Sequence, residues 1–284
     1  MLSGIHNHTS FCDGQSTAEQ MVLGAIERGF VSIGLSGHAY TPFDLRYAMR
    51  DTDAYIQEVR RLQKVYAKEI EVYLGAEENV YAPVARGDFD YIIGSSHYLF
   101  LDRSKRKDSM AVNPAATSYP WAAYPIDSSP IYFEACLDAY EKDYHRLAED
   151  YYSTFCQYIL SRRPDVVGHF DLITKFDENE HPHFLGDLEY HRIAAKYLVE
   201  SLRADVIYEV NTGAISRGYR KTPYPYIDLL HLLKKHGARV TVTTDSHAVS
   251  TLDFGMAEAK AMLRDVGFTH TYILHGGEFR PDAL

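Results

Sequence analysis

Short apolar runs alternate with longer segments of helical spacing along most of this 284-residue sequence. The predicted strands span residues 4–8, 31–36, 70–76, 91–95, 165–168, 205–210, 239–243 and 271–274. The predicted helices span residues 17–29, 51–68, 130–163, 187–203, 224–236 and 253–266, and the long one over 130–163 is either continuous or broken. Such alternation is typical of parallel strands joined by crossover helices. Since about seven or eight units of this kind close more readily into a barrel than into an open sheet, we expect an α/β barrel.

Local signals mark both ends of the first predicted helix. Thr17 and Gln20 have the spacing of a capping box, in which each side chain accepts a hydrogen bond from the other residue's backbone N–H. Gly29 follows the last helical position, where a glycine in the left-handed conformation often ends a helix. These residues predict a helix whose two ends are defined by its own sequence.

Residues 101–129 interrupt the alternation of strands and helices. This segment carries a basic cluster followed by a stretch rich in Pro, Ala and Tyr, and it is too long for an ordinary loop between a strand and a helix. We therefore expect one domain over residues 1–284 with an insertion at about 101–129. The insertion is either a surface excursion or a flap over an active site.

Composition narrows the classes of partner. The formal net charge is −10, and an acidic surface repels the phosphate backbone of nucleic acids. The sequence contains no run of 18 apolar residues and no basic-then-apolar leader at its start, so we expect no membrane partner. Its three scattered cysteines, Cys12, Cys136 and Cys156, suit a reducing compartment. We expect a cytoplasmic protein, and the sequence carries no indication of its oligomeric state.

Histidines and carboxylates follow the predicted strands. His6 and His8 form His-x-His at the end of the first strand, and residues i and i+2 of a strand point to the same side. Asp245 and His247 repeat this spacing after the run 239–243. Two such side chains that converge at a strand end can bind a transition metal. Each pair is therefore a candidate for part of a metal site.

The same placement recurs on four more strands. A potential ligand follows each of their apolar runs: His38, Glu77, His97 and His169. All carboxyl ends of the strands in a parallel barrel open on one face, where active sites are built. Packing alone does not explain why a potential ligand follows each of these strands. The recurrence predicts that the side chains converge on one metal centre.

The motifs together resemble the polymerase-and-histidinol-phosphatase (PHP) family. The matching stretches are His6–Gly14 (HNHTSFCDG), Ser36–His38, Glu77 and Asp245–His247, while His97 and His169 fall at intermediate ligand positions. The resemblance runs from residue 6 to about residue 250. It implies a distorted (β/α)7 barrel, TIM-like, in a single domain.

The family resemblance also implies a site with two or three divalent metal ions. The implied ligands are His6, His8, Asp13, His38, Glu77, His97, His169, Asp245 and His247. Glu77 would bridge two ions, whereas Asp13 is either a ligand or a residue that orients a ligand. Imidazole and carboxylate ligands suit Zn²⁺, Mn²⁺ or Fe²⁺ better than Ca²⁺.

Within the family, the chain looks most like the stand-alone histidinol-phosphate phosphatases. This likeness rests on the form Phe-Cys-Asp-Gly in the first motif, on the segment 168–173 and on the absence of appended domains. It implies an enzyme of histidine biosynthesis that hydrolyses a small phosphate monoester, L-histidinol phosphate, to L-histidinol and phosphate by attack of a metal-bound hydroxide.

Other residues are candidates for handling the phosphate and the leaving group. Arg217 follows a predicted strand and has a guanidinium suited to clamping phosphate oxygens; Lys175 and His38 are further candidates for phosphate binding. Asp245 or His247 would relay a proton to the leaving alkoxide, although metal ligation is the more conservative role for both. We therefore count Arg217, Asp245 and His247 as candidate catalytic residues.

Three alternatives remain open from the sequence. A PHP-type phosphoesterase could act on a nucleotide phosphodiester or on phosphotyrosine, and the negative charge disfavours the first of these substrates. An amidohydrolase-type barrel also begins with His-x-His, but the pair Asp245-x-His247 counts against it. A non-catalytic metal-binding protein would need no arginine beside its ions.

Overall fold

Seven parallel strands form one curved sheet in the computed structural model, which describes residues 1–102, 121–179 and 182–284. Their order is β1 (Ser3–Gly4), β2 (Ser32–Leu35), β3 (Glu71–Asn79), β4 (Tyr91–Ser95), β7 (Val166–Val167), β8 (Ile207–Asn211) and β9 (Arg239–Thr243). The sheet curls into a nearly closed barrel. Past the ends of β1 and β9, Asn7 and Ser246 form a parallel bridge, and the backbone N–H of His8 donates to the Ser246 carbonyl at 2.8 Å. The predicted (β/α)7 barrel is confirmed.

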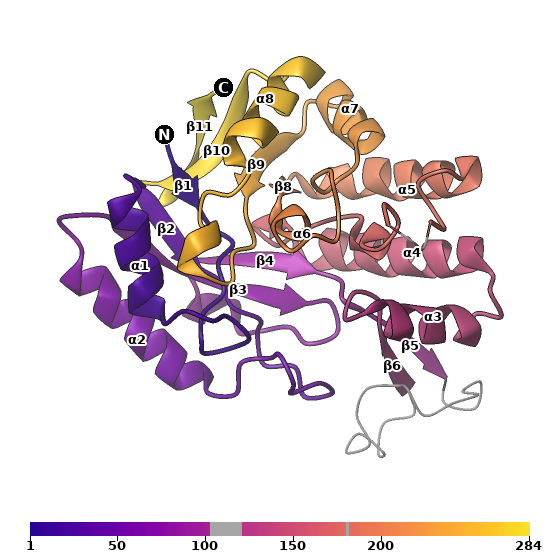
Figure 1. Ribbon diagram of the computed structural model, residues 1–284, viewed down its shortest axis with the longest axis horizontal. Coiled ribbons are helices and arrows are strands. Elements are labelled where there is room, and N and C mark those ends of the chain that lie inside the picture. Colours follow the sequence, from indigo (N-terminus) through magenta and orange to yellow (C-terminus); the bar gives the residue numbers. More distant parts are fainter. Residues whose placement is uncertain (103–120, 180–181) are drawn as a thin grey trace.

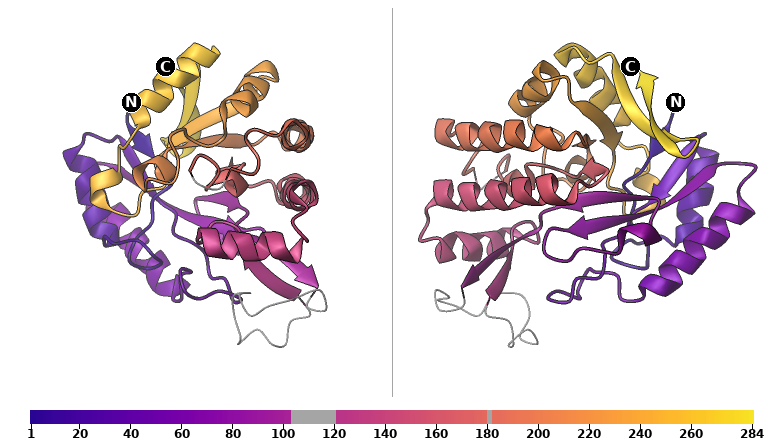
Figure 2. Two further views of the ribbon diagram at one scale, coloured as in Figure 1. Left: turned by 45° about the vertical axis from the view of Figure 1, so that its right-hand side comes forward. Right: turned by 180° about the vertical axis from the view of Figure 1, so that it is seen from behind.

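Helices lie around the outside of the strands (Figures 1 and 2). They are α1 (Ala18–Glu27), α2 (Thr52–Val65), α3 (Pro130–Ala139), α4 (Tyr144–Arg162), α5 (Leu188–Ser201), α6 (Gly213–Ser216), α7 (Ile227–Lys235) and α8 (Met256–Val266). Short 3-10 turns lie at Arg86–Asp88, Leu172–Thr174, Leu202–Ala204 and Val249–Thr251. The capping box of α1 is present, because Thr17 and Gln20 bond to each other's backbone N–H. None of the described helices has the length and apolar character that crossing a membrane requires.

Two predicted elements need comment. The long helix expected over 130–163, for which a break was left open, is divided into α3 and α4, since Glu141 and Lys142 adopt positive φ angles of 56° and 62° between them. The strand expected at 271–274 is β10 (His270–His275), which pairs antiparallel with β11 (Glu278–Ala283) and does not join the barrel ladder. Leu274 of β10 instead packs into the apolar cluster inside the barrel, so this hairpin covers one end of the core.

The predicted insertion at 101–129 is only partly described, because residues 103–120 lie outside the described part of the chain. Its described flanks contribute to an antiparallel pair, β5 (Tyr98–Asp102) and β6 (Trp121–Pro125), which the sequence did not predict. Phe43 packs edge-on against the rings of Tyr98 and Phe100 in β5. An active-site flap formed by the insertion stays a prediction.

Tyr91 fills the interior of the barrel from β4. Its hydroxyl donates to the carbonyl of Ile5, one residue before the first metal-ligand candidate. The ring passes against Gly34 and Gly75, where an added Cβ would lie 2.1 Å from the Tyr91 Oη and 2.2 Å from its Cζ, respectively. Glycine at these two positions is therefore required by the close approach of the tyrosine ring.

We expect Gly34→Ala to destabilise the barrel, because the new methyl group must displace the Tyr91 ring. Overpacking of this kind typically costs about 1–3 kcal/mol, and urea unfolding followed by circular dichroism measures it. Gly87→Ala is the control, since a Cβ there meets nothing within 4 Å. Equal stability of the Gly34 and Gly87 variants would contradict this account of the barrel interior.

Candidate metal centre

The structure brings all nine predicted ligands to one mouth of the barrel, at the carboxyl ends of its strands. They come from the segments after β1, β2, β4, β7 and β9 and from within β3: His6, His8, Asp13, His38, Glu77, His97, His169, Asp245 and His247. Glu77 lies inside β3 because that strand runs three residues further than predicted, to Asn79. His38 forms a parallel bridge with Glu77, which ties the end of β2 to β3.

Glu77 is the centre of the cluster. Its side chain is fully buried, and its two carboxylate oxygens face five imidazole rings. Oε1 lies 2.9 Å from Nε2 of both His97 and His169. Oε2 lies 2.7 Å from Nδ1 of His38, 3.4 Å from Nε2 of His6 and 3.5 Å from Nε2 of His8. This arrangement places Glu77 where a bridging ligand would lie.

Asp245 supplies a second buried carboxylate opposite Glu77. Its Oδ1 lies 2.9 Å from Nε2 of His8 and 3.7 Å from Nε2 of His6. The residue has a positive φ of 46°, a left-handed conformation that is costly for a residue with a side chain and tends to occur at functional sites. Gly213 makes room for it, since a Cβ at Gly213 would lie 2.7 Å from the Asp245 Cβ.

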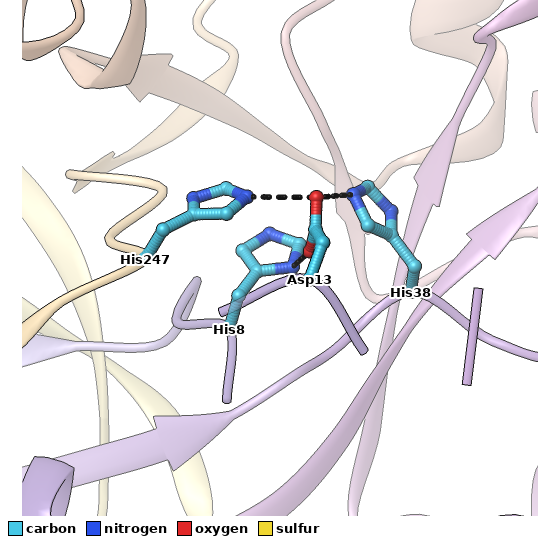
Figure 3. A group of neighbouring side chains, drawn as sticks. All are labelled: His8, Asp13, His38 and His247. Atoms are coloured by element: carbon cyan, nitrogen blue, oxygen red, sulfur yellow. Dashed lines mark ion pairs between the residues drawn. The ribbon is translucent and has the colours of Figure 1, made fainter. Parts of the chain in front are cut away.

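The open corner of the cluster is formed by His8, Asp13, His38 and His247 (Figure 3). Asp13 Oδ2 lies 3.4 Å from Nε2 of His247 and 3.7 Å from Nε2 of His38, and Oδ1 lies 3.5 Å from Nδ1 of His8. Asp13 is the most exposed of the four, with 32% of its side chain accessible. Both roles considered for Asp13 stay predictions: Oδ2 faces two ring nitrogens as a ligand would, and Oδ1 faces Nδ1 of His8 as an orienting residue would.

Unpaired polar atoms test whether the cluster fits metal ions. Among the described residues, His6 Nε2, His8 Nε2, Glu77 Oε2 and Asp245 Oδ1 are buried and make no hydrogen bond of acceptable geometry, although His8 Nε2 lies 2.9 Å from Asp245 Oδ1 and Glu77 Oε2 lies 2.7 Å from Nδ1 of His38. Buried polar atoms are normally paired, because an unsatisfied one costs about 1–3 kcal/mol. These four point toward one another, and nitrogen and carboxylate oxygen are the donors that Zn²⁺, Mn²⁺ and Fe²⁺ accept. The residues present therefore fit divalent cations.

The electrostatics of the cluster follow from its mixture of buried carboxylates and imidazoles. Burial by itself would raise the pKa of Glu77, but the surrounding imidazoles hold this pKa well below its usual range. Burial by itself would lower the pKa of His97, and the carboxylates of Asp127 and Glu77 raise it to about 10. Protons and metal ions therefore compete for the same ring nitrogens, so metal binding would release protons.

The two predicted phosphate-binding cations, Arg217 and Lys175, contact different residues of the site. Arg217 donates to the backbone carbonyl of Asp245 from Nη1 and to its Oδ2 from Nη2, both at 2.8 Å. Its guanidinium is thus already engaged with one of the candidate ligands. Lys175 donates from Nζ to the backbone carbonyl of Asp127 at 2.7 Å and lies 3.4 Å from the Asp127 carboxylate.

A cavity of about 310 Å³ opens beside the cluster. Asp13, His38 and His97 form one part of its wall, and the remaining wall includes Asp44, Arg46, Tyr47, Tyr98, Asp127 and Lys175. Asp44 is buried and held by a two-point pairing with Arg46, at 2.9 and 2.7 Å. The cavity therefore lies between the candidate ligands and a wall of paired charged side chains. Its volume is suited to a small molecule.

Sequence reasoning missed two carboxylates that touch the candidate ligands. Glu209 accepts a hydrogen bond from Nδ1 of His6, and Asp127 lies 3.4 Å from Nδ1 of His97. One feature of the sequence could have indicated Glu209: it is an acidic residue inside the apolar run of the predicted strand 205–210. Asp127 lies in the segment that was predicted as an insertion, so no strand end pointed to it.

Fold and site together define a class of protein: a parallel α/β barrel with a multi-ligand cluster of His, Asp and Glu at the carboxyl ends of its strands. The match to the PHP domain family model covers residues 4–213 of this chain. The chain therefore belongs to the PHP family. This membership sets aside the amidohydrolase-type barrel that the first His-x-His motif left open.

Relatives in two organisms carry the name "Probable histidinol-phosphatase". The protein of Schizosaccharomyces pombe is 28% identical over 297 residues, which cover 96% of this chain and 89% of the relative. That of Deinococcus radiodurans is 24% identical over 283 residues, 94% of each chain. A crystal structure of histidinol phosphate phosphatase from Lactococcus lactis, complexed with zinc, L-histidinol and phosphate, has a TM-score of 0.67 at 18% identity and covers 98% of each chain. At this identity, the structural match supports the shared fold.

Zinc is expected to stabilise the protein through Glu77. At about 100 times its Kd, a ligand that binds only the folded state adds about 2.7 kcal/mol to the free energy of unfolding. We expect Glu77→Gln to lose most of this gain, because the amide removes the charge that faces five imidazoles. Denaturant unfolding with and without zinc measures the difference.

Glu78→Gln is the matched control for that experiment. Glu78 is the next residue of β3, is also buried, and pairs with Arg162 at 2.8 Å through both of its oxygens. Its loss should lower stability and leave the zinc-dependent gain intact. A Glu77→Gln protein that gains as much from zinc as the wild type would contradict the central position of Glu77.

Proposed function

We propose that the protein is a metal-dependent phosphomonoesterase that hydrolyses L-histidinol phosphate to L-histidinol and phosphate. The observation that carries the proposal is the buried Glu77 carboxylate, faced by five imidazoles. Two of these imidazoles, those of His38 and His97, line a cavity of about 310 Å³. Membership in the PHP family supports hydrolysis of a phosphate ester, and the names of both relatives support the substrate.

Two or three divalent ions, Zn²⁺, Mn²⁺ or Fe²⁺, are proposed as cofactors. Four overlapping groups of side chains would hold them: His6, His8 and Glu77; His6, His169 and Asp245; His38, Glu77 and His97; and His8, Asp13, His38 and His247. Zinc is favoured by the L. lactis structure, which contains it. Such ions neutralise phosphate oxygens and lower the pKa of a bound water toward about 7.

The chain's own residues would bind and orient the phosphate. Arg217 holds Asp245 by two hydrogen bonds and has 30% of its side chain accessible, so part of its guanidinium faces the open side. Lys175 and His38 line the cavity, where their nitrogen atoms would meet phosphate oxygens. A cation next to the metals would complement the charge that builds up as the ester bond breaks.

His247 is the better placed of the two candidates for protonating the leaving alkoxide. It is 21% accessible at the open corner, whereas only 8% of the Asp245 side chain is accessible. Its Nδ1 lies 2.9 Å from the carbonyl of Asp245 and 3.2 Å from Nη1 of Arg217, so these two groups fix the orientation of the ring. Nε2 then faces Asp13 and the open side, where it would act either as a metal ligand or in the proton relay.

The cavity wall offers carboxylates to a small cationic substrate. Asp44 and Asp127 line the cavity, where Arg46 and Lys175 already pair with them, and the ammonium and imidazole groups of histidinol would share these carboxylates. This wall supports a monoester of a small cationic alcohol as the substrate.

Phosphate release tests the proposed function. We expect L-histidinol phosphate to be hydrolysed with a higher kcat/KM than phosphotyrosine or a phosphodiester model substrate, because its cationic groups match the cavity wall. Prior removal of metal with a chelator should abolish release, and zinc or manganese should restore it. Faster hydrolysis of phosphotyrosine or the diester would refute the substrate, and full activity in the metal-free protein would refute the proposed mechanism.

Arg217→Ala should lower kcat/KM for histidinol phosphate by about 10²–10³, the usual loss when one donor to the developing charge is removed. Steady-state kinetics at saturating zinc measures the effect. Arg61→Ala is the control, since Arg61 lies on α2 and pairs with Glu58 at the surface. An Arg217 variant as active as the Arg61 variant would exclude this arginine from the reaction.

A further inference from the structure

Glu209 of β8 is a fully buried carboxylate on which hydrogen-bond donors from four strand ends converge. It is 1% exposed and lies beneath the cluster, on the inner face of the barrel. Its Oε1 accepts from Nδ1 of His6 at 2.5 Å and from Oγ1 of Thr243 at 2.6 Å. Its Oε2 accepts from the backbone N–H of His169 at 2.7 Å and from Nδ2 of Asn211 at 3.0 Å.

These contacts determine which nitrogen of His6 carries a proton. A carboxylate can only accept, so the His6 nitrogen that faces Glu209 must donate. A proton on Nδ1 leaves the lone pair of Nε2 directed at the cluster, where Nε2 lies 3.4 Å from Glu77 Oε2 and 3.7 Å from Asp245 Oδ1. A ring nitrogen binds a metal ion only through such a lone pair.

We propose that Glu209 is a positioning residue that holds His6 in the form protonated on Nδ1 and so keeps Nε2 available for a metal ion. The same carboxylate accepts a hydrogen bond from the backbone N–H of His169, so it also fixes the chain that follows β7. The role rests on the proposed function, in which the cluster holds ions. Glu209 itself touches neither the substrate cavity nor the candidate ions.

The substitution Glu209→Gln has a predictable consequence, because the four groups that donate hydrogen bonds to the Glu209 side chain are not equivalent. The backbone N–H of His169 cannot accept a hydrogen bond, so the amide oxygen of Gln must face it. The amide NH₂ group then faces His6 and Thr243. The hydroxyl of Thr243 can turn to accept, but Nδ1 of His6 can accept only after losing its proton. The proton of a neutral ring would then lie on Nε2, where it blocks metal binding.

Two measurements on the folded full-length chain test the proposal. Zinc affinity is measured by competition with a chromogenic chelator, and we expect Glu209→Gln to bind about 10–100-fold more weakly than the wild type. The protonation of His6 is read from ring ¹⁵N shifts of histidine-labelled protein, with the His6 signal identified by its absence in His6→Asn. The wild type should carry a proton on Nδ1, and Glu209→Gln should lack it.

Two variants separate positioning from general destabilisation. Asp177→Asn removes another buried carboxylate, which accepts from the backbone N–H groups of His183, Phe184 and Leu185 and contacts none of the nine candidate ligands. We expect it to lower stability and leave zinc affinity unchanged. Thr243→Val keeps the Glu209 carboxylate, so His6 should stay protonated on Nδ1 and zinc affinity should stay within about threefold of the wild type.

The outcomes separate this proposal from the proposed function. A wild-type protein that binds no zinc would defeat the metal-dependent function, whatever the state of His6. A wild-type protein that binds zinc, with His6 lacking a proton on Nδ1, would overturn the role of Glu209. The same holds if Glu209→Gln binds zinc as tightly as the wild type. If Glu209→Gln fails to fold, the wild-type ¹⁵N spectrum still decides the protonation of His6.

Discussion

The whole arrangement depends on a carboxylate buried among imidazoles. Glu77 cannot lie in the barrel mouth without compensation, because burying a charge is costly unless it is paired. The compensation comes from His38, His97 and His169 at 2.7–2.9 Å and from the cations that the remaining unpaired atoms would accept. The chemistry of the site and the stability of this end of the barrel are therefore linked through one side chain.

Closure of the barrel completes the cluster. His6 and His8 lie near the start of the chain and Asp245 and His247 near its end, and they meet only where Asn7 bridges to Ser246. The Tyr91 ring supports this junction from inside, through its hydrogen bond to Ile5. Since the ligands of each proposed ion come from distant parts of the sequence, an unfolded chain offers no formed site. Ion binding would thus favour the closed barrel.

The sequence was most informative where one geometric rule applied. Parallel strands end on the same face, so an imidazole or carboxylate after each apolar run predicted that His6, His38, His169 and Asp245 would converge, and the structure places them together. The first helix was also predicted well, because Thr17 and Gln20 act locally.

Other features depend on contacts that no local pattern encodes. Glu209 and Asp127 owe their roles to hydrogen bonds with residues far away in the sequence, and strand periodicity alone does not reveal them. The last predicted strand, β10, forms a hairpin with β11 across Gly276 and Gly277 and stays outside the ladder. Arg217 was predicted to clamp phosphate oxygens, and its bond to the Asp245 carboxylate could not be read from the sequence. Tertiary pairing decided each of these cases.

The central claim is that one carboxylate organises ions held by side chains from distant strands. Anomalous diffraction from crystals grown with zinc tests it directly, since the signal locates each ion without reference to activity. The account predicts peaks at about 2.0–2.2 Å from the Glu77 oxygens and from the neighbouring imidazole nitrogens. A cluster with no peak at coordinating distance from Glu77, in protein saturated with zinc, would contradict it.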